Sequence, residues 1–394
     1  MALVHVHGVG NRSGDDNEAG TALRDGLYRK FLIPALFAAP DRTRILNPVW
    51  GDQAAQARWG FASFPSSETE QLGGDADVEE LLPGALVDVG DDPETCLLNT
   101  ARRSMPDAVD ALFTAAAVTH TDPASLDEFA AAAVRYTDSR ESRFPRATEP
   151  QRYPWLDEVT DDEEFVERLD TEVLSDTPRD GTYESLGGSD SIREKLGYGL
   201  AAIRRSCVAM ATRPTVGLVR ALAGPRVSLL LGDVLIYLAQ RGTTESPGPI
   251  VRTVADALDE AVAGADDGEP LIVLAHSMGG NIMYDLLTHY RPDLHVDLLV
   301  TIGTQVGLFE ELKLFRASRA DVPNGDEPYA STPSNVGRWL NVLDRSDPLA
   351  YRAAPVFGSV SDYTYPSGAL WAHTAYLHQP HFHARLTRRL TEPQ

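Results

Sequence analysis

The stretch "IVLAHSMGGNIMYD", residues 272–285, decides the fold. Its first half is almost wholly apolar, as in a strand buried on both faces of a parallel sheet. Its second half spaces apolar residues as an α-helix does and begins with two glycines. Ser277 stands at the junction. We therefore expect this serine at the carboxyl edge of a sheet, where open α/β folds bind their ligands.

The rest of the chain repeats this alternation of helices with short apolar strands. We expect strands in "ALVHVHG", "RILNPVW", "LIVLA", "VDLLVTIG" and "RWLNVLD", and helices over residues 18–37, 227–241, 250–262 and 279–290. Such strands between helices indicate a parallel sheet that is covered on both faces. The predicted fold class is α/β, with a mostly parallel central sheet and helices on both faces.

Residues 62–225 have a different character. Acidic loops and Pro-rich joints separate Ala-rich or charged helical segments there, and strand signals nearly vanish. We expect a large, mostly helical insertion that forms a cap or lid, and a discontinuous core domain made of residues 1–61 and 226–394. The amphipathic segment 189–223 is expected to pack against the core; a role in an apolar acyl pocket or at a lipid surface is the alternative.

Composition limits the partners and the location. The formal net charge of −23 excludes nucleic acid as an expected partner, because phosphate binding needs clustered Lys and Arg. No stretch has the apolar length of a membrane span, and the nearest candidate contains Asp233.

Cys96 and Cys207 match no metal or redox spacing, so we expect no disulfide framework. The chain starts directly in a strand pattern without a secretory signal, so we expect a cytoplasmic protein, and the oligomeric state stays open.

The residues around Ser277 suit a sharp turn between strand and helix. Small residues are needed two positions before and two after the serine, and Ala275 and Gly279 meet this need. This is the GxSxG pattern of a nucleophile elbow, with Ala at the first position. The amides that begin the following helix favour negative charge developing at the serine. A serine that merely caps helix 279–290 is the alternative interpretation.

A serine nucleophile needs two hydrogen-bond donors for the oxyanion. One is the amide after the serine, Met278, and the other comes from a loop after an early strand. His7 and Gly8 end the first strand, which makes the amide of Val9 the second candidate donor. An ordinary glycine turn is the alternative interpretation of this loop.

The acid and the base are expected downstream of the serine, in that order. Two aspartates, Asp344 and Asp347, follow the strand "RWLNVLD". We favour Asp347 as the acid because it lies on the loop beyond the strand, whereas Asp344 is expected to cap the turn. Asp362 is a weaker candidate that we expect in a solvated loop. His373, the first histidine after these aspartates, is the candidate base.

A metal site is the competing interpretation of the C-terminal histidines. Four of them are close in sequence: His373, His378, His381 and His383. Pro380 breaks the helical register between them, and no Cys or carboxylate lies at the spacing of a zinc site. We therefore expect no metal.

Six segments together resemble the α/β-hydrolase superfamily, in particular its serine esterase and lipase branch, which includes triacylglycerol lipases and GPI-inositol-deacylase-like proteins. They are "VHGVG", "LGDVLIYL", "IVLAHSMGGNI", "LVTIGTQVGL", "LNVLDRSDPLA" and "HTAYL", within residues 1–55 and 226–390. The resemblance implies an α/β-hydrolase fold and a serine hydrolase without a cofactor. The residues it implies are Ser277 as nucleophile, His373 as base, Asp347 as orienting acid, and Val9 and Met278 as oxyanion donors.

The function that we expect is hydrolysis of a carboxylic ester, by an esterase or a lipase acting on a small-molecule or lipid-like substrate. An amidase or peptidase with the same triad is the first alternative. An interaction protein, in which the hydrolase body only carries the insertion and the triad is idle, is the second.

Overall fold

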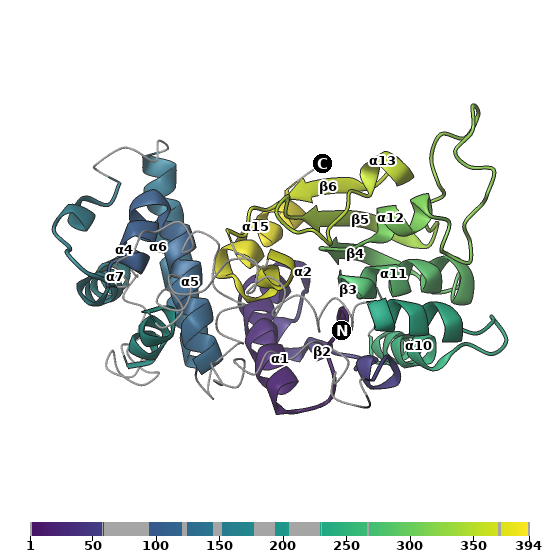
Figure 1. Ribbon diagram of the computed structural model, residues 1–394, viewed down its shortest axis with the longest axis horizontal. Coiled ribbons are helices and arrows are strands. Elements are labelled where there is room, and N and C mark those ends of the chain that lie inside the picture. Colours follow the sequence, from purple (N-terminus) through teal and green to yellow (C-terminus); the bar gives the residue numbers. More distant parts are fainter. Residues whose placement is uncertain are drawn as a thin grey trace, which may run out of the picture. The chain divides into compact units, whose positions relative to one another are not determined.

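The computed structural model describes residues 2–56, 58, 94–119, 124–144, 152–176, 194–204, 229, 231–265, 268–368 and 372–392 (Figure 1). The chain divides into two compact units. The sheet unit comprises Met1–Asn17, Phe37–Gln71 and Thr215–Pro366, and the helical unit comprises Glu18–Leu36, Leu72–Pro214 and Ser367–Gln394. The greater part of the amphipathic segment 189–223 lies outside the described residues.

The sheet unit contains six parallel strands in the order β2-β1-β3-β4-β5-β6. They are β1 (Ala2–Val6), β2 (Arg44–Leu46), β3 (Leu271–His276), β4 (Val296–Ile302), β5 (Val336–Leu343) and β6 (Ser361–Thr364). Every residue of β1 and β3 is buried, as the apolar runs predict for strands in the interior of a parallel sheet. The α/β class is therefore confirmed.

Strand β6 was not expected from the sequence. It is short, lies at an edge of the sheet and is only partly buried, so its residues lack the apolar run that marks the other strands. Asp362 lies in this strand and not in a solvated loop, so that expectation was wrong. Its carboxylate accepts hydrogen bonds from the Asn341 side chain at 2.9 Å and from the Ala353 amide at 2.9 Å. Asp362 therefore ties β6 to β5 and to the start of α13 (Ala354–Phe357), the helix that precedes β6 in the chain.

Helices and strands of the sheet unit share one apolar core. The helices are η2 (Pro40–Arg42), η3 (Gly51–Gln53), α10 (Pro249–Ala263), α11 (Met278–Asp285), η6 (Leu286–Tyr290), α12 (Val306–Glu311), α13 (Ala354–Phe357) and residues 231–240. Tyr284 of α11 contacts Phe315, Trp339 and Phe357, with ring centroids 4.3, 5.9 and 5.1 Å away. Burial of each such side chain contributes about 1.5–3 kcal/mol and fixes α11 on the sheet.

In the described residues of the helical unit every regular element is a helix. They are α1 (Asp15–Leu27, which begins in the sheet unit), η1 (Tyr28–Leu32), α2 (Ile33–Leu36), α4 (Cys96–Arg103), α5 (Met105–Thr119), α6 (Ala124–Arg143), η5 (Pro154–Asp157), α7 (Asp162–Ser175), residues 194–204, α14 (Ala372–Ala375), η7 (Tyr376–His378) and α15 (Pro380–Thr391). Two segments that the sequence assigned to the core domain, Glu18–Leu36 and Ser367–Gln394, belong to this unit. They do so because α15 packs against η1, α5 and α6.

Cys96, at the start of α4, is disulfide-bonded. The expectation of no disulfide was therefore wrong for Cys96. The sequence contains one other cysteine, Cys207, which lies outside the described residues. Spacing along the chain could not reveal the bond, because a disulfide depends on the distance between the two Cα atoms in the fold.

Among the described helices none combines the length and the apolar character needed to cross a membrane. In the segment that came nearest to this pattern, Asp233 is fully buried within the sheet unit.

Three C-terminal histidines lie inside the helical unit, with His381 and His383 buried and His378 half-buried. His381 lies between the Asp110 carboxylate, 2.9 Å from Nδ1, and the Thr137 hydroxyl, 2.8 Å from Nε2. Burial lowers the pKa of His378 to about 4 and that of His383 to about 3. The Nε2 atom of His383 is 3.1 Å from the Leu377 carbonyl oxygen. The described part of the chain groups no three His, Cys, Asp or Glu side chains as a metal would require.

The buried histidines predict that acid destabilises the helical unit. The folded pKa values of His378 and His383, about 4 and about 3, lie below the ordinary value of 6.5. At pH values between these and 6.5 the unfolded chain therefore binds more protons than the folded protein. Stability is therefore lost as the pH falls from 6.5 towards 4. Asp162 and Asp107 have the opposite sign, because burial raises the pKa of both carboxyl groups, that of Asp162 to about 6, and their ionisation costs stability as the pH rises. The pKa shifts of the two histidines are the larger ones, so a net loss of stability in acid is expected.

Urea denaturation between about pH 7 and pH 4.5 measures this dependence. In His383→Phe, which keeps an aromatic ring against Tyr28 and cannot titrate, the loss of stability in acid should be smaller. His295→Gln, which removes an exposed histidine of the sheet unit, is the control for the loss of a histidine side chain. An equal loss in the wild type and in His383→Phe would contradict the prediction.

Candidate active site

Ser277 occupies a strained turn between β3 and α11. Its backbone has φ 52° and ψ −125°, a region that residues other than glycine rarely adopt and that costs about 1–3 kcal/mol. The Ser277 amide donates to the Ile302 carbonyl at 2.9 Å, which joins the turn to the end of β4. The serine side chain makes no capping hydrogen bond to α11. The interpretation of Ser277 as a simple helix cap is therefore not supported.

Two glycines let α11 begin this close to the sheet. A Cβ atom on Gly279 would lie 2.2 Å from the Val6 carbonyl oxygen, and one on Gly280 would lie 2.5 Å from Thr304 Cγ2. Any larger residue at position 279 would therefore push the first turn of α11 away from the end of β1. The contact of Gly279 with the Val6 carbonyl oxygen explains why the sequence pattern requires a small residue two positions after Ser277.

The loop after β1 lies directly beside Ser277. A Cβ atom on Gly8 would be 2.7 Å from Ser277 Cβ and 3.2 Å from Ser277 Oγ. Residues that are about 270 positions apart in sequence therefore meet at the carboxyl edge of the sheet, because β1 and β3 are parallel neighbours. Val9 follows directly after Gly8, the residue that contacts Ser277.

His7 fixes the peptide between Gly8 and Val9. The Trp50 amide donates to His7 Nε2 at 3.2 Å, so the ring proton is on Nδ1, which donates to the Gly8 carbonyl oxygen at 2.6 Å. The His7 ring also stacks on Trp50, with centroids 4.8 Å apart and planes inclined by 8°. In a trans peptide the Val9 N–H points opposite to the Gly8 carbonyl. His7 thus sets the direction of the Val9 amide.

Trp50 was not identified from the sequence, where it only ended a predicted strand. It is fully buried, and its indole N–H donates to the His7 carbonyl oxygen at 2.9 Å. The only signal in the sequence was a large aromatic residue directly after a short strand, which is too common to indicate a site.

Met278 is buried at the first position of α11. The Asn281 side-chain amide lies 3.3 Å from Met278 Sδ and donates to the Gln305 side-chain oxygen at 3.1 Å. Gln305 in turn donates to the Leu349 carbonyl oxygen at 2.6 Å. These two amides, which the sequence did not single out, connect the first turn of α11 to the loop that follows β5.

Both candidate acids lie on that loop and are almost fully buried, with 3% of Asp344 and 4% of Asp347 exposed. Asp344 accepts from the amide and the hydroxyl of Ser346, at 2.8 and 2.7 Å, and so caps the turn. Asp347 accepts from the Leu349 amide at 2.8 Å. Since β3 and β5 are parallel, with β4 between them, this loop and Ser277 lie at the same edge of the sheet.

His373 lies in α14 of the helical unit, and 6% of it is exposed. The sheet unit therefore contains the serine, the two candidate donors and both acids, whereas the candidate base comes from the other unit.

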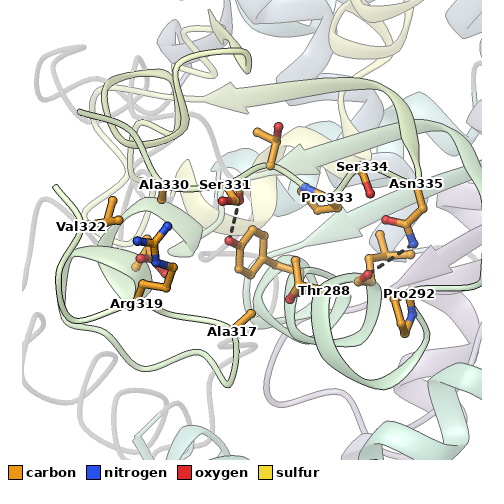
Figure 2. A pocket seen from close by; sticks show the side chains of 14 residues that line it. Thr288, Pro292, Ala317, Arg319, Val322, Ala330, Ser331, Pro333, Ser334 and Asn335 are labelled. Atoms are coloured by element: carbon orange, nitrogen blue, oxygen red, sulfur yellow. Dashed lines mark hydrogen bonds between the residues drawn. The ribbon is translucent and has the colours of Figure 1, made fainter. Parts of the chain in front are cut away.

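A cavity of about 290 Å³ in the sheet unit lies at the other end of α11 (Figure 2). Three of its polar side chains bond within the protein. Tyr284 donates to the Ser331 carbonyl oxygen at 2.9 Å, Arg319 pairs with Asp321, and Asn335 donates to the Leu294 carbonyl oxygen at 2.7 Å. This cavity is not part of the site around Ser277.

No protein-family model, curated protein or solved structure matches this chain. What can be inferred about its function therefore comes from the residues and geometry described above.

The strained backbone of Ser277 predicts an unusual order of stabilities. Ser277→Ala keeps the strain and Ser277→Gly removes it, while both remove the hydroxyl. We expect the glycine variant to be the more stable by about 1 kcal/mol, after subtraction of the entropy that glycine adds to the unfolded chain. Paired urea denaturation curves measure the difference. An alanine variant more stable than the glycine variant would show that the turn is not strained.

Proposed function

We propose that this protein is a serine hydrolase of the α/β-hydrolase fold that cleaves a carboxylic ester. Ser277 is the nucleophile, His373 the base, Asp347 the orienting acid, and the amides of Val9 and Met278 are the oxyanion donors. The observation that carries the proposal is the left-handed backbone of Ser277 at the β3–α11 turn, beside Gly8. Strain of this kind in a non-glycine residue persists where the fold enforces it, and it is concentrated at active sites.

The proposed chemistry follows from these groups. His373 takes the hydroxyl proton as Ser277 Oγ attacks the ester carbonyl carbon, and the carbonyl oxygen becomes an oxyanion that the two amides bind. The tetrahedral intermediate collapses, the C–O bond to the alcohol breaks, and His373 returns the proton to the alcohol. Water then attacks the acyl-enzyme by the same route and releases the acid. Asp347 holds the imidazole in the tautomer that this requires.

Other observations support an oxyanion site. The loop of Gly8 and Val9 and the first turn of α11 both lie at the carboxyl edge of the sheet, where α/β folds bind ligands. His7 and Trp50 hold the Gly8–Val9 peptide in one orientation, and a donor that is fixed before the reaction stabilises developing charge most effectively. The resemblance to esterases and lipases makes a small or lipid-like ester with an apolar acyl group the proposed substrate.

A fluorophosphonate probe tests the nucleophile. We expect covalent labelling of the wild type at Ser277 and none of Ser277→Ala. Hydrolysis of 4-nitrophenyl butyrate should fall by about 10⁴-fold or more in this variant, whose fold should be unchanged. A panel of esters and amides separates an esterase from an amidase or peptidase. Absence of labelling in the folded wild type, together with no hydrolysis of the panel, would favour an idle hydrolase body.

Two substitutions distinguish the acids. Asp347→Asn should reduce kcat by about 10³–10⁴-fold, because the histidine loses the partner that sets its tautomer. Asp344→Asn should lower stability, since it weakens the turn with Ser346, and should leave kcat within about tenfold of the wild type. Steady-state kinetics with the same ester measure both effects. The reverse result would assign the acid to Asp344.

A further inference from the structure

One buried carboxylate, Asp233, holds the loop that carries Val9. Asp233 lies in the helical residues 231–240 and is fully buried. Its Oδ2 atom accepts from the Gly10 amide at 3.1 Å, and its Oδ1 atom accepts from Arg12 Nη2 at 2.7 Å and from the Ala55 amide at 2.9 Å. Charge-assisted hydrogen bonds of this kind are stronger than neutral ones. Asp233 thus joins three separate segments of the sheet unit.

Residues 50–55 also hold the loop. Arg12 donates from the same Nη2 atom to the Ala55 carbonyl oxygen at 2.8 Å. Asp52 accepts a hydrogen bond from the Ser13 amide at 2.9 Å. A Cβ atom on Gly51 would lie 1.7 Å from the Asn11 carbonyl oxygen, so this close approach of the two backbones requires glycine.

We infer that Asp233 is a positioning residue for the oxyanion donor, an inference that rests on the proposed function. Val9 lies between two anchored peptides: His7 holds the carbonyl before it, and Asp233 holds the Gly10 amide after it. Gly10 has φ 82°, so the chain turns immediately after Val9. With both neighbouring peptides held, the Val9 N–H keeps one direction relative to Ser277. Asp233 itself contacts no substrate in this proposal.

The chain offers a matched control. Asp285 is also fully buried and also accepts from an arginine and a backbone amide, with Arg241 Nη1 at 2.7 Å and the Arg316 amide at 2.8 Å. It lies at the last position of α11, the end opposite Ser277. Asp285 also accepts from the Tyr237 hydroxyl at 2.9 Å, so it too is anchored to residues 231–240. Asp285→Asn should therefore destabilise the sheet unit in the same way as Asp233→Asn while it keeps the hydrogen bonds of Asp233 to Gly10, Arg12 and Ala55.

The experiment compares these two variants with the wild type in hydrolysis of 4-nitrophenyl butyrate. An oxyanion donor acts in the transition state, so Asp233→Asn should lower kcat by about tenfold or more with KM unchanged. The affinity for a boronic acid inhibitor, which forms a tetrahedral adduct, should fall with kcat. In Asp285→Asn, kcat and the affinity for the boronic acid should stay within about twofold of the wild type. Thermal unfolding should show a loss of stability in both variants.

A second variant and a second measurement cover the case in which Asp233→Asn does not fold. Arg12 is partly exposed, and Arg12→Lys keeps the charge while losing the fork that joins Asp233 to Ala55. It should show a smaller loss of kcat, again at constant KM. Hydrogen exchange of the Gly10 amide should be faster in either loop variant than in the wild type or Asp285→Asn.

The results separate the two proposals. Hydrolysis that depends on Ser277, with kcat and Gly10 exchange unchanged in Asp233→Asn and Arg12→Lys, would overturn the positioning role and leave the proposed function intact. Equal loss of kcat in Asp233→Asn and Asp285→Asn would also overturn it, since a general loss of stability would then explain both. A wild type without hydrolysis or labelling would overturn the proposed function and, with it, the inference.

Discussion

Close backbone contact around Ser277 is the constraint on which the candidate site depends. Gly279 lies against the carbonyl oxygen of Val6, and Gly8 lies against the serine side chain, at separations that leave no room for a Cβ atom. These contacts hold Ser277 in a conformation that an isolated chain would avoid. The apolar packing of Tyr284 against the sheet keeps α11 in place and so offsets the strain. The strained backbone of Ser277 therefore depends on the packing of α11 against the sheet.

Carboxylates with little or no exposed surface have a recurring role in the sheet unit. Asp233 and Asp285, which are fully buried, and Asp362, which is half-buried, each accept a hydrogen bond from at least one backbone amide and each pair with an arginine. A buried charge is costly unless it is paired and hydrogen-bonded, and these residues meet both conditions. Because each carboxylate joins segments from different elements, it specifies how loops lie on the sheet. The strongly acidic composition therefore includes residues that position the backbone, besides those that keep the surface solvated.

The sequence was informative where one local pattern implied one structure. Long apolar runs between helices marked β1, β3, β4 and the core of β5, and the small residues around Ser277 marked a sharp turn. It failed where the signal was short or depended on distant partners. The four residues of β6 have no apolar run, and Asp362 looked like a loop residue for that reason. The disulfide of Cys96 and the partners of His381 depend on distances in the fold that spacing along the chain does not encode.

By itself, the amino-acid sequence determined the α/β class, the succession of the first five strands along the chain and the position of Ser277 between a strand and a helix, because these follow from periodicity and from the size of nearby residues. Only the tertiary structure decided which distant groups surround that serine. Trp50 and Asp233 come from segments far from Val9 in sequence, and their hydrogen bonds form only when the parallel sheet brings those segments to one edge. The structure likewise assigned Ser277 and His373 to different compact units, since helix packing follows buried apolar faces and not the order of the chain.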